Sequence, residues 1–316
     1  MKILVLGAGV IGCNLAHNLH QAGKKVTLLA RATWMETLRT NGLVIRNRFS
    51  LRKSCDRIPV VSDLLQEDIY DVIFVCLRYT QLSDVLDKLR NNDSSHIVFI
   101  GNNMDAEGIA KALPEKHVMF GFVSSAGHRE KDCVVSVDLK KITIGVLRGD
   151  VPHDRLCTQI FAGTKYRVRY EANMGDYLRS HAAFVLPAAF ACYYAEGNLK
   201  KIRKDRALIE KIMDANAECY EALEKLGYEL LPKGEEDYRS AKYRKMCYWF
   251  YRLMCSTFLG KLCVSDHALS AVDEMDLLAA ELEKLVQRSG VEAKKFHELK
   301  QYMLPYLERG NEDGIL

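Results

Sequence analysis

Residues 2–30 read KILVLGAGVIGCNLAHNLHQAGKKVTLLA, and this stretch decides the fold of the first part of the chain. The aliphatic run 2–6 predicts a strand that is buried on both faces, as in a parallel sheet. Residues 13–22 carry apolar side chains at helical spacing, and residues 25–30 predict a second strand. Strand, glycine-rich turn, helix and strand within about 30 residues are typical of a βαβ unit.

The turn in this unit has the glycine spacing GxGxxG. Gly7 permits a tight turn, Gly9 lets the backbone approach a pyrophosphate, and Gly12 allows the helix to pack closely on the strand. The N-terminus of the helix adds N–H groups and the positive end of a dipole. The sequence therefore predicts a dinucleotide site whose backbone is Gly7, Ala8, Gly9, Val10, Ile11 and Gly12.

The end of the second strand predicts which dinucleotide is bound. An acidic residue there binds the ribose 2′-hydroxyl of NAD and repels the 2′-phosphate of NADP. This strand ends in Leu28-Leu29-Ala30-Arg31, and the first acidic residue after it is Glu36. Arg31 offers a planar donor fork for a phosphate, so the sequence favours NADP over NAD.

The rest of the chain separates into a strand-rich and a helical part. Strand-like segments lie at 71–77, 96–101, 117–122 and 165–170, with a hairpin expected from 134–137 and 141–146. Helices are expected at 177–194, 204–226, 235–258, 273–289 and 293–307. The predicted fold class is α/β, with an N-terminal Rossmann-type doubly wound parallel sheet followed by an all-helical C-terminal domain. We expect an NADP-binding domain at 1–171 and a helical substrate or dimerisation domain at 172–316.

Two basic or aromatic patterns in the helical part could imitate a nucleic-acid surface. In the expected helix 235–258, apolar residues recur at steps of three and four and form one face, which we expect to pack in the core: Met246, Trp249, Phe250, Leu253, Met254, Thr257 and Phe258. The basic run at 200–206 is expected to be a solvated face.

Composition excludes several classes of protein. The chain has 316 residues, 48% of them hydrophobic and 27% charged, and its net charge of +4 gives no reason to expect nucleic acid as a partner. Ten cysteines without a CxxC pair predict reduced thiols in a cytoplasmic protein and no metal site. The longest apolar stretch, 182–195, is too short to span a bilayer and contains Pro187, and the glycine-rich N-terminus is not a signal peptide.

An ordered series of short motifs resembles the ketopantoate reductase (2-dehydropantoate 2-reductase) family over nearly the whole chain. In the first half these are GAGVIG at 7–12, Arg31, VCLRYTQ at 75–81, IGNNM at 100–104, which is similar to the family's "HNGM" turn, and ITIG at 142–145. In the second half they are ALEKLG at 222–227, Asp266, and DEMD at 273–276, which is similar to "TEID".

The resemblance implies hydride transfer from NADPH to a 2-oxo acid in a cleft between the two domains. It implies that Asn102 contacts the cofactor near its reactive end and the substrate, and that Glu274 binds the cofactor ribose or fixes the closed cleft. Arg78 stands where the family often has a lysine beside the cofactor, and Leu77 and Gln81 belong to the same cofactor-binding segment.

The catalytic position departs from the family pattern. Family members carry a lysine on the first helix of the second domain, with polar residues four and eight positions later. This chain has Ser180, Phe184 and Ala188 there, on one helical face. A serine hydroxyl carries no positive charge and is a much poorer acid than an ammonium group. His181, about 100° round the helix from Ser180, is the other candidate proton donor.

The sequence leaves more than one function open. The leading interpretation is an NADPH-dependent reductase of a small-molecule carbonyl substrate, a 2-oxo acid or related compound more apolar than ketopantoate. The alternative is a non-catalytic NADP-binding sensor or scaffold, which the missing lysine favours, and an opine-type dehydrogenase is a third. Whether the helical domain mediates a homodimer also stays open.

Overall fold

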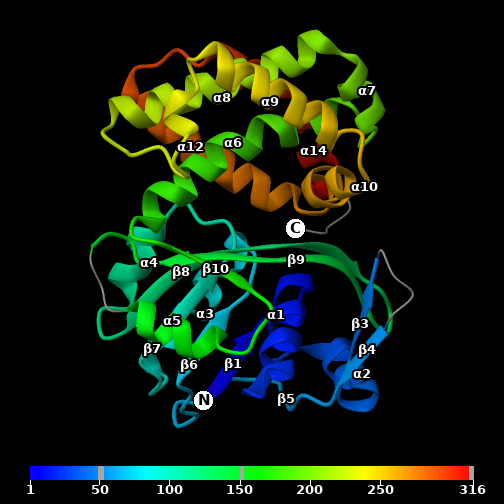
Figure 1. Ribbon diagram of the computed structural model, residues 1–316, viewed down its shortest axis with the longest axis vertical. Helices are drawn as coiled ribbons and strands as arrows, with labels where there is room; N and C mark the ends of the chain where they lie inside the picture. The colour runs from blue at the N-terminus through cyan, green and yellow to red at the C-terminus, as the bar shows by residue number, and fades with distance from the viewer. Residues whose placement is uncertain (49–52, 150–152, 313–316) are drawn as a thin grey trace. The chain divides into compact units, whose positions relative to one another are not determined.

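The computed structural model describes residues 1–48, 53–149 and 153–312 (Figure 1). It contains two compact units, the N-terminal unit Met1–Gly175 and the C-terminal unit Asp176–Leu316. The N-terminal unit is built on a curled, largely parallel sheet with helices, and the C-terminal unit is helical, which confirms the predicted fold class.

Within the described residues, ten strands form a single sheet in the N-terminal unit. They are β1 Lys2–Leu6, β2 Lys25–Leu29, β3 Leu43–Asn47, β4 Lys53–Asp56, β5 Val60–Val61, β6 Val72–Val75, β7 His96–Ile100, β8 His117–Arg129, β9 Val134–Gly145 and β10 Arg167–Glu171. Their order is β4-β3-β9-β8-β7-β6-β1-β2-β5, with β10 beside β9. The pairs β8–β9 and β3–β4 are antiparallel, and the other pairs are parallel.

The order of the central strands creates the place where a ligand is expected. The chain runs from β1 to β2 on one side and then returns to β6 on the other side of β1. Loops therefore leave the carboxyl ends of β1 and β6 in opposite directions, and open α/β sheets bind ligands at such a switch point. Ile3, Val5 and Phe74 of these strands are completely buried, as expected for strands covered on both faces.

The helices of the N-terminal unit are α1 Val10–Gln21, α2 Ala32–Asn41, α3 Ser83–Asn91, α4 Ala106–Ala112 and α5 His153–Phe161. Those of the C-terminal unit are α6 Met174–Tyr194 (which begins in the last residues of the N-terminal unit), α7 Leu199–Lys204, α8 Arg206–Lys225, α9 Ala241–Met254, α10 Phe258–Gly260, α11 Asp266–Ser270, α12 Val272–Ser289, α13 Lys294–Lys300 and α14 Leu304–Glu312. None of the described helices is long and apolar enough to cross a membrane.

The hairpin expected from 134–137 and 141–146 was wrong, because both segments belong to the single strand β9. The hairpin partner of β9 is β8, which pairs with it from Arg129 back to Phe120. The polar residues between the two segments suggested a turn. In the structure Asp138 and Lys140 instead have polar partners on α1, and Lys140 takes a positive φ of 54° where the strand bends.

The packed face predicted for 235–258 was also wrong. Most of this segment forms α9, whose buried stripe is Tyr243, Cys247 and Tyr251. The predicted face is largely outside, and Trp249 and Leu253 are 56% and 63% exposed. The buried tyrosines have polar partners: the Tyr251 hydroxyl donates to Asn216 Oδ1 at 2.7 Å, and the Tyr243 hydroxyl donates to Glu235. Spacing alone could not show which of two apolar stripes faces the core.

Asn216 of α8 also replaces a hydrogen bond that is missing from α6. Pro187 has no N–H, so the carbonyl of Ala183, four residues earlier, loses its helical partner. The Asn216 side-chain amide donates to the carbonyls of Ala183 and Phe184, both at 2.9 Å. A single buried side chain therefore joins α6, α8 and α9.

Candidate dinucleotide site

The glycine-rich turn between β1 and α1 has the geometry that its spacing predicts. Gly7 has a φ of +111° and donates its N–H to the Leu29 carbonyl at 3.2 Å, which ties the turn to β2. A Cβ on Gly7 would overlap the carbonyl oxygen of Cys76, and a Cβ on Gly12 would overlap that of Gly7. Gly9 differs, because a Cβ there would meet no atom within 4 Å. Packing therefore requires glycine at 7 and 12, whereas at Gly9 the backbone faces open space.

Open backbone at Gly9 leaves the start of α1 accessible. Gly9 is the N-cap of this 12-residue helix and supplies no side-chain cap, and the first turn contains no acidic residue. The first N–H groups of a helix have no intrahelical acceptors and carry partial positive charge. This is the arrangement that receives a pyrophosphate in dinucleotide-binding βαβ units, so the residues present fit the predicted cofactor.

Trp34 holds the turn from the other side, a residue that the sequence analysis missed. Its indole N–H donates to the Ala8 carbonyl at 2.9 Å, and the Cys13 thiol donates to the same oxygen at 3.4 Å. Trp34 lies in the first turn of α2, next to the predicted 2′-phosphate residue Arg31. A tryptophan at this position is equally compatible with ordinary core packing, so its bond to the turn could be found only in three dimensions.

Arg31 is the N-cap of α2, with extended backbone and an exposed side chain. Its guanidinium makes no hydrogen bond or ion pair with any residue that the structure describes. The charge of Arg31 acts on the carboxylate of Asp63, which is hydrogen-bonded to Lys88. That hydrogen bond lowers the pKa of Asp63, and the charge of Arg31 acts in the same direction. Arg31 is therefore available to a phosphate.

The loops after β6 and β7 meet beside the glycine-rich turn. A Cβ on Gly7 would lie 3.1 Å from the Leu77 side chain, and a Cβ on Gly101 would lie 3.7 Å from the Leu77 carbonyl oxygen. Gln81 closes the Arg78 turn, since its side chain accepts from the Arg78 N–H at 3.3 Å and its N–H donates to the Arg78 carbonyl at 2.9 Å. The N-terminal unit thus brings the predicted residues of three separate segments to one edge of the sheet.

The asparagines that follow Gly101 include a buried donor without a protein partner. Asn102 is half-buried. Asn103 is buried, and its Oδ1 accepts from the Asp105 N–H at 2.9 Å, which fixes the orientation of its amide. The Nδ2 of Asn103 has no hydrogen-bond partner among the described residues. An unsatisfied buried donor is costly, and one at this edge of the sheet is of the kind that a ligand carbonyl satisfies.

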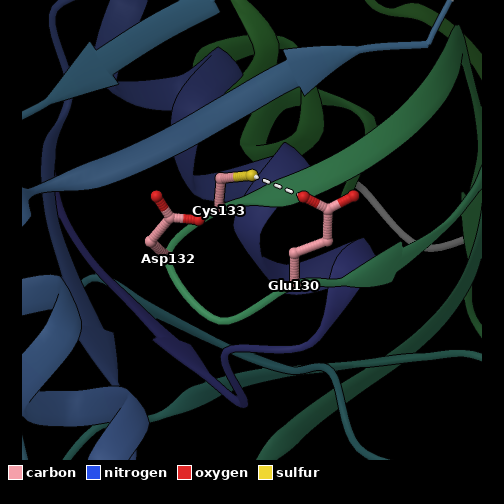
Figure 2. A group of neighbouring side chains, drawn as sticks. All are labelled: Glu130, Asp132 and Cys133. Carbon is pink, nitrogen blue, oxygen red and sulfur yellow. Dashed lines mark hydrogen bonds between the residues drawn. The ribbon is translucent and has the colours of Figure 1, made fainter.

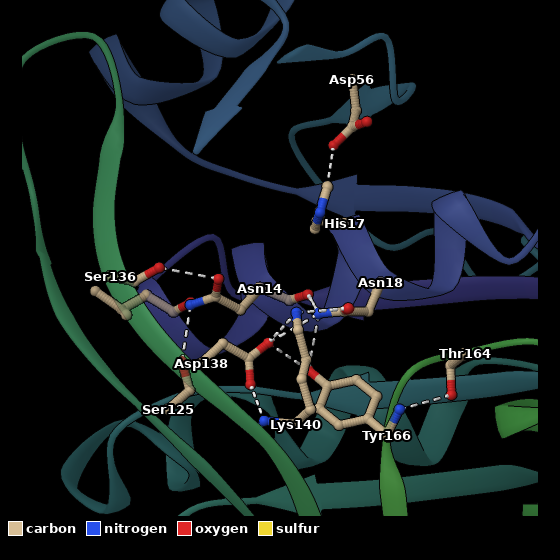
Figure 3. A network of polar contacts seen from close by, with 11 residues as sticks. Asn14, His17, Asn18, Asp56, Ser125, Ser136, Asp138, Lys140, Thr164 and Tyr166 are labelled. Carbon is tan, nitrogen blue, oxygen red and sulfur yellow. Dashed lines mark hydrogen bonds and ion pairs between the residues drawn. The ribbon is translucent and has the colours of Figure 1, made fainter. Parts of the chain in front are cut away.

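A buried polar network holds α1 against the β8–β9 hairpin (Figure 3). Asn14 donates to Ser125 Oγ at 2.8 Å and accepts from Ser136 Oγ at 3.0 Å. One turn later Asn18 donates to Asp138 at 2.9 Å and accepts from Lys140 at 2.7 Å. Because Asn14 and Asn18 are each bound at both the donor and the acceptor of the side-chain amide, the helix that begins at the glycine-rich turn is fixed in rotation and depth.

Glu130, Asp132 and Cys133 lie together at the tip of the same hairpin (Figure 2). The Cys133 thiol donates to Glu130 at 3.6 Å, and the other oxygen of Glu130 pairs with Arg46 at 2.5 Å. Burial and then the neighbouring carboxylates raise the pKa of the Cys133 thiol, which opposes the thiolate form that metals bind. Through the Glu130–Arg46 pair, this cluster connects the hairpin to β3.

The C-terminal unit contains the other predicted site residues, and Ser180 has structural partners there. Ser180 is 1% exposed; its hydroxyl accepts from the Leu231 N–H at 3.1 Å and donates to the Glu229 carbonyl at 3.5 Å. Asp176 accepts from the Glu229 N–H at 2.9 Å and pairs with Arg179 at 3.1 Å. The first turns of α6 thus hold the 229–231 segment.

The neighbours of Ser180 are aromatic and apolar. His181 stacks on Tyr177, with ring centroids 6.4 Å apart. Burial lowers the pKa of His181 to about 4, and the charge of His267 contributes in the same direction. Phe184 contacts the rings of Phe250 and Tyr251, with centroids 5.9 and 5.7 Å away. Ala188 is half-buried.

Glu274 is buried in the first turn of α12, where its carboxylate lies at the positive end of that helix. The sequence pointed to Glu274 only because DEMD at 273–276 resembles a motif of the family.

The chain is similar to known proteins in sequence and in fold. Residues 3–149 match the model of the family described as ketopantoate reductase PanE/ApbA. This match covers most of the N-terminal unit, which is similar to that family over these residues. A curated relative is the uncharacterized oxidoreductase YkpB of Bacillus subtilis (strain 168), which is 24% identical over 174 residues, or 53% of this chain and 56% of that protein. The match therefore spans about half the length of that relative.

Solved structures of two 2-dehydropantoate 2-reductases and of a D-mandelate dehydrogenase share the fold of this chain over nearly its whole length. The 2-dehydropantoate 2-reductase from Geobacter metallireducens GS-15 has a TM-score of 0.78 at 15% identity and covers 97% of this chain and 100% of its own. The enzyme from Methylococcus capsulatus has a TM-score of 0.72 at 17% identity, with coverages of 98% and 97%. D-mandelate dehydrogenase, solved with NADH and anilino(oxo)acetate, has a TM-score of 0.78 at 16% identity, with coverages of 98% and 100%.

Proposed function

We propose that this chain is an NADPH-dependent reductase that converts a 2-oxo acid or a related carbonyl compound to the corresponding alcohol, and that ketopantoate is not its substrate. The observation that carries the proposal is the glycine-rich turn, where packing excludes side chains at Gly7 and Gly12 while Gly9 and the start of α1 remain open. The ketopantoate reductase domain at 3–149 supports a reductase, and the exposed Arg31 at the end of β2 supports NADPH.

Residues of the N-terminal unit would bind the cofactor and the substrate. Gly7 to Gly12 would bind the pyrophosphate, and Arg31 the 2′-phosphate. Asn102 would face the reactive end of the cofactor, together with Leu77 and the turn closed by Arg78 and Gln81. Bound NADPH would supply the hydride, and one proton from the protein or from water would complete the alcohol. Arg78 would attract the carboxylate of the substrate.

The C-terminal unit carries the other residues to which the proposal gives a role, on α6 and at Glu274. Ser180 would act as a positioning residue, since its hydroxyl already bonds the 229–231 segment at both its donor and its acceptor. With a pKa of about 4, His181 is neutral near pH 7, so it would donate a hydrogen bond more readily than a proton. Phe184 and Ala188 would line an apolar wall, which favours an aryl or alkyl side chain on the substrate over a hydroxylated one.

A second candidate function is a non-catalytic NADP-binding sensor, and the engaged Ser180 hydroxyl is the observation that favours it. The two functions are separated by following NADPH absorbance with a panel of 2-oxo acids that runs from ketopantoate to aryl and branched alkyl compounds. The reductase proposal expects turnover with an apolar member of the panel. Tight NADPH binding without turnover of any member of the panel would favour the non-catalytic sensor.

A further inference from the structure

Arg129 reaches the glycine-rich turn from an element that is distant in sequence. It ends β8 and pairs with Val134 of β9 in the hairpin that lies along α1. Asp138, farther from the hairpin tip, contacts Asn18, whereas Ser136 contacts Asn14, one turn nearer the start of α1 (Figure 3). The hairpin therefore runs toward the N-terminus of α1, and its last residues lie at that end of the helix.

One contact places the Arg129 side chain there, and an electrostatic effect agrees with it. Its guanidinium lies over the Trp34 ring, 5.0 Å from the ring centroid, and the indole N–H of that ring holds the Ala8 carbonyl of the turn. The charge of Arg129 also acts on Cys13, in the first turn of α1: burial raises the pKa of the Cys13 thiol to about 12, and Arg129 opposes the increase. Arg129 therefore lies near the two side chains, Trp34 and Cys13, that donate to the Ala8 carbonyl of the turn.

The guanidinium of Arg129 is also available to a ligand. Its side chain is exposed, and within the described parts of the chain it makes no hydrogen bond or ion pair. The adjacent acid, Glu130, does not neutralise it, because Glu130 pairs with Arg46 at 2.5 Å and with His128 at 3.5 Å. Stacking on Trp34 holds the flat donor fork in place, which reduces the entropy lost when it binds a phosphate.

We propose that Arg129 is a pyrophosphate-binding residue that contacts the dinucleotide from the β8–β9 hairpin, opposite the N–H groups of α1. The inference rests on the proposed function and adds to it a division between two arginines. Arg31, at the start of α2, serves the 2′-phosphate that only NADPH carries. Arg129, beside the turn at Ala8 and Gly9, serves the pyrophosphate that NADPH and NADH share.

The experiment compares dissociation constants for NADPH and NADH in the full-length protein, measured by calorimetry. We expect R129Q to weaken both cofactors by the same factor, about tenfold or more, as for a lost hydrogen bond to a charged group. R129K keeps the charge but lacks the planar fork, so it should recover part of the loss for both cofactors. R31A should weaken NADPH alone.

The matched control is K131Q, which removes a positive charge from the same hairpin two residues away and should leave both constants unchanged. Thermal unfolding of each variant verifies that the fold is kept. Unchanged binding in R129Q would overturn the proposal, and so would a loss confined to NADPH, which would assign Arg129 to the 2′-phosphate. If the parent protein bound neither dinucleotide, the proposed function would fail, and the arginine assignment would fail with it.

Discussion

Replacement of Gly9 by alanine is expected to weaken cofactor binding while leaving the fold almost unchanged. Gly9 has a φ of −78°, which alanine adopts without strain, and a Cβ there would meet no protein atom within 4 Å. The cost to the fold is that of a poorer N-cap, about 1 kcal/mol or less, which corresponds to a fall of roughly 2–4 °C in Tm. The added methyl group would occupy the space through which a pyrophosphate approaches the backbone. Overpacking of this kind costs about 1–3 kcal/mol, or a 5- to 150-fold weaker Kd.

Gly12→Ala is the matched control, because the same methyl group there would overlap the Gly7 carbonyl oxygen. It should lower the stability of the fold itself, by about 3 kcal/mol or more. The assay pairs chemical denaturation with titration of NADPH by calorimetry for the parent protein and both variants. If G9A bound NADPH as tightly as the parent protein, the glycine-rich turn would not be the pyrophosphate site, and the argument from open backbone at Gly9 would be refuted.

Three further predictions concern selectivity, chemistry and pH. The parent protein should bind NADPH much more tightly than NADH, and R31A should weaken NADPH by about 1–3 kcal/mol with NADH unchanged; equal affinities of the parent protein for both cofactors would exclude this role for Arg31. Steady-state assays should detect no useful reduction of ketopantoate, and S180K should not restore it, because position 180 is buried and its hydroxyl holds the 229–231 segment; an ordinary kcat/KM for ketopantoate would contradict this. Since burial lowers the pKa of His181 to about 4 from an unfolded value near 6.5, the unfolded state alone takes up this proton as the pH falls from 6.5 to 4. The free energy of unfolding should therefore decrease over that range, by at most about 3 kcal/mol from this group, and be unaffected by it above pH 6.5. Denaturation at pH 7.5 and pH 5 should show a smaller decrease in H181F than in the parent protein; an equal decrease in both would count against a neutral His181 in the folded protein.

The sequence predicted the parts of the fold in which local pattern and tertiary environment agree. β1, α1 and β2 follow from an aliphatic run, three glycines and a helical repeat, because a buried parallel strand and a tight glycine turn each tolerate few other residues. The prediction from sequence failed where one polar or apolar pattern was compatible with two structures. Asp138 and Lys140 suggested a turn but lie in β9 with partners on α1, and the apolar stripe of α9 that contains Trp249 is the exposed one.

The candidate site shows the same division. By itself, the sequence determined the tight glycine turn between β1 and α1 and the arginine, in place of an acidic residue, after β2, since these are properties of neighbouring residues in one βαβ unit. Only the tertiary structure decided that Trp34 holds Ala8, that Arg129 lies over Trp34, and that Ser180 holds the 229–231 segment. Each of these contacts joins segments that the chain separates by up to about a hundred residues, and an arginine, a tryptophan or a serine has many compatible surroundings. Which surroundings it has depends on how the sheet curls and which helix packs against it, and no local pattern of residues encodes that.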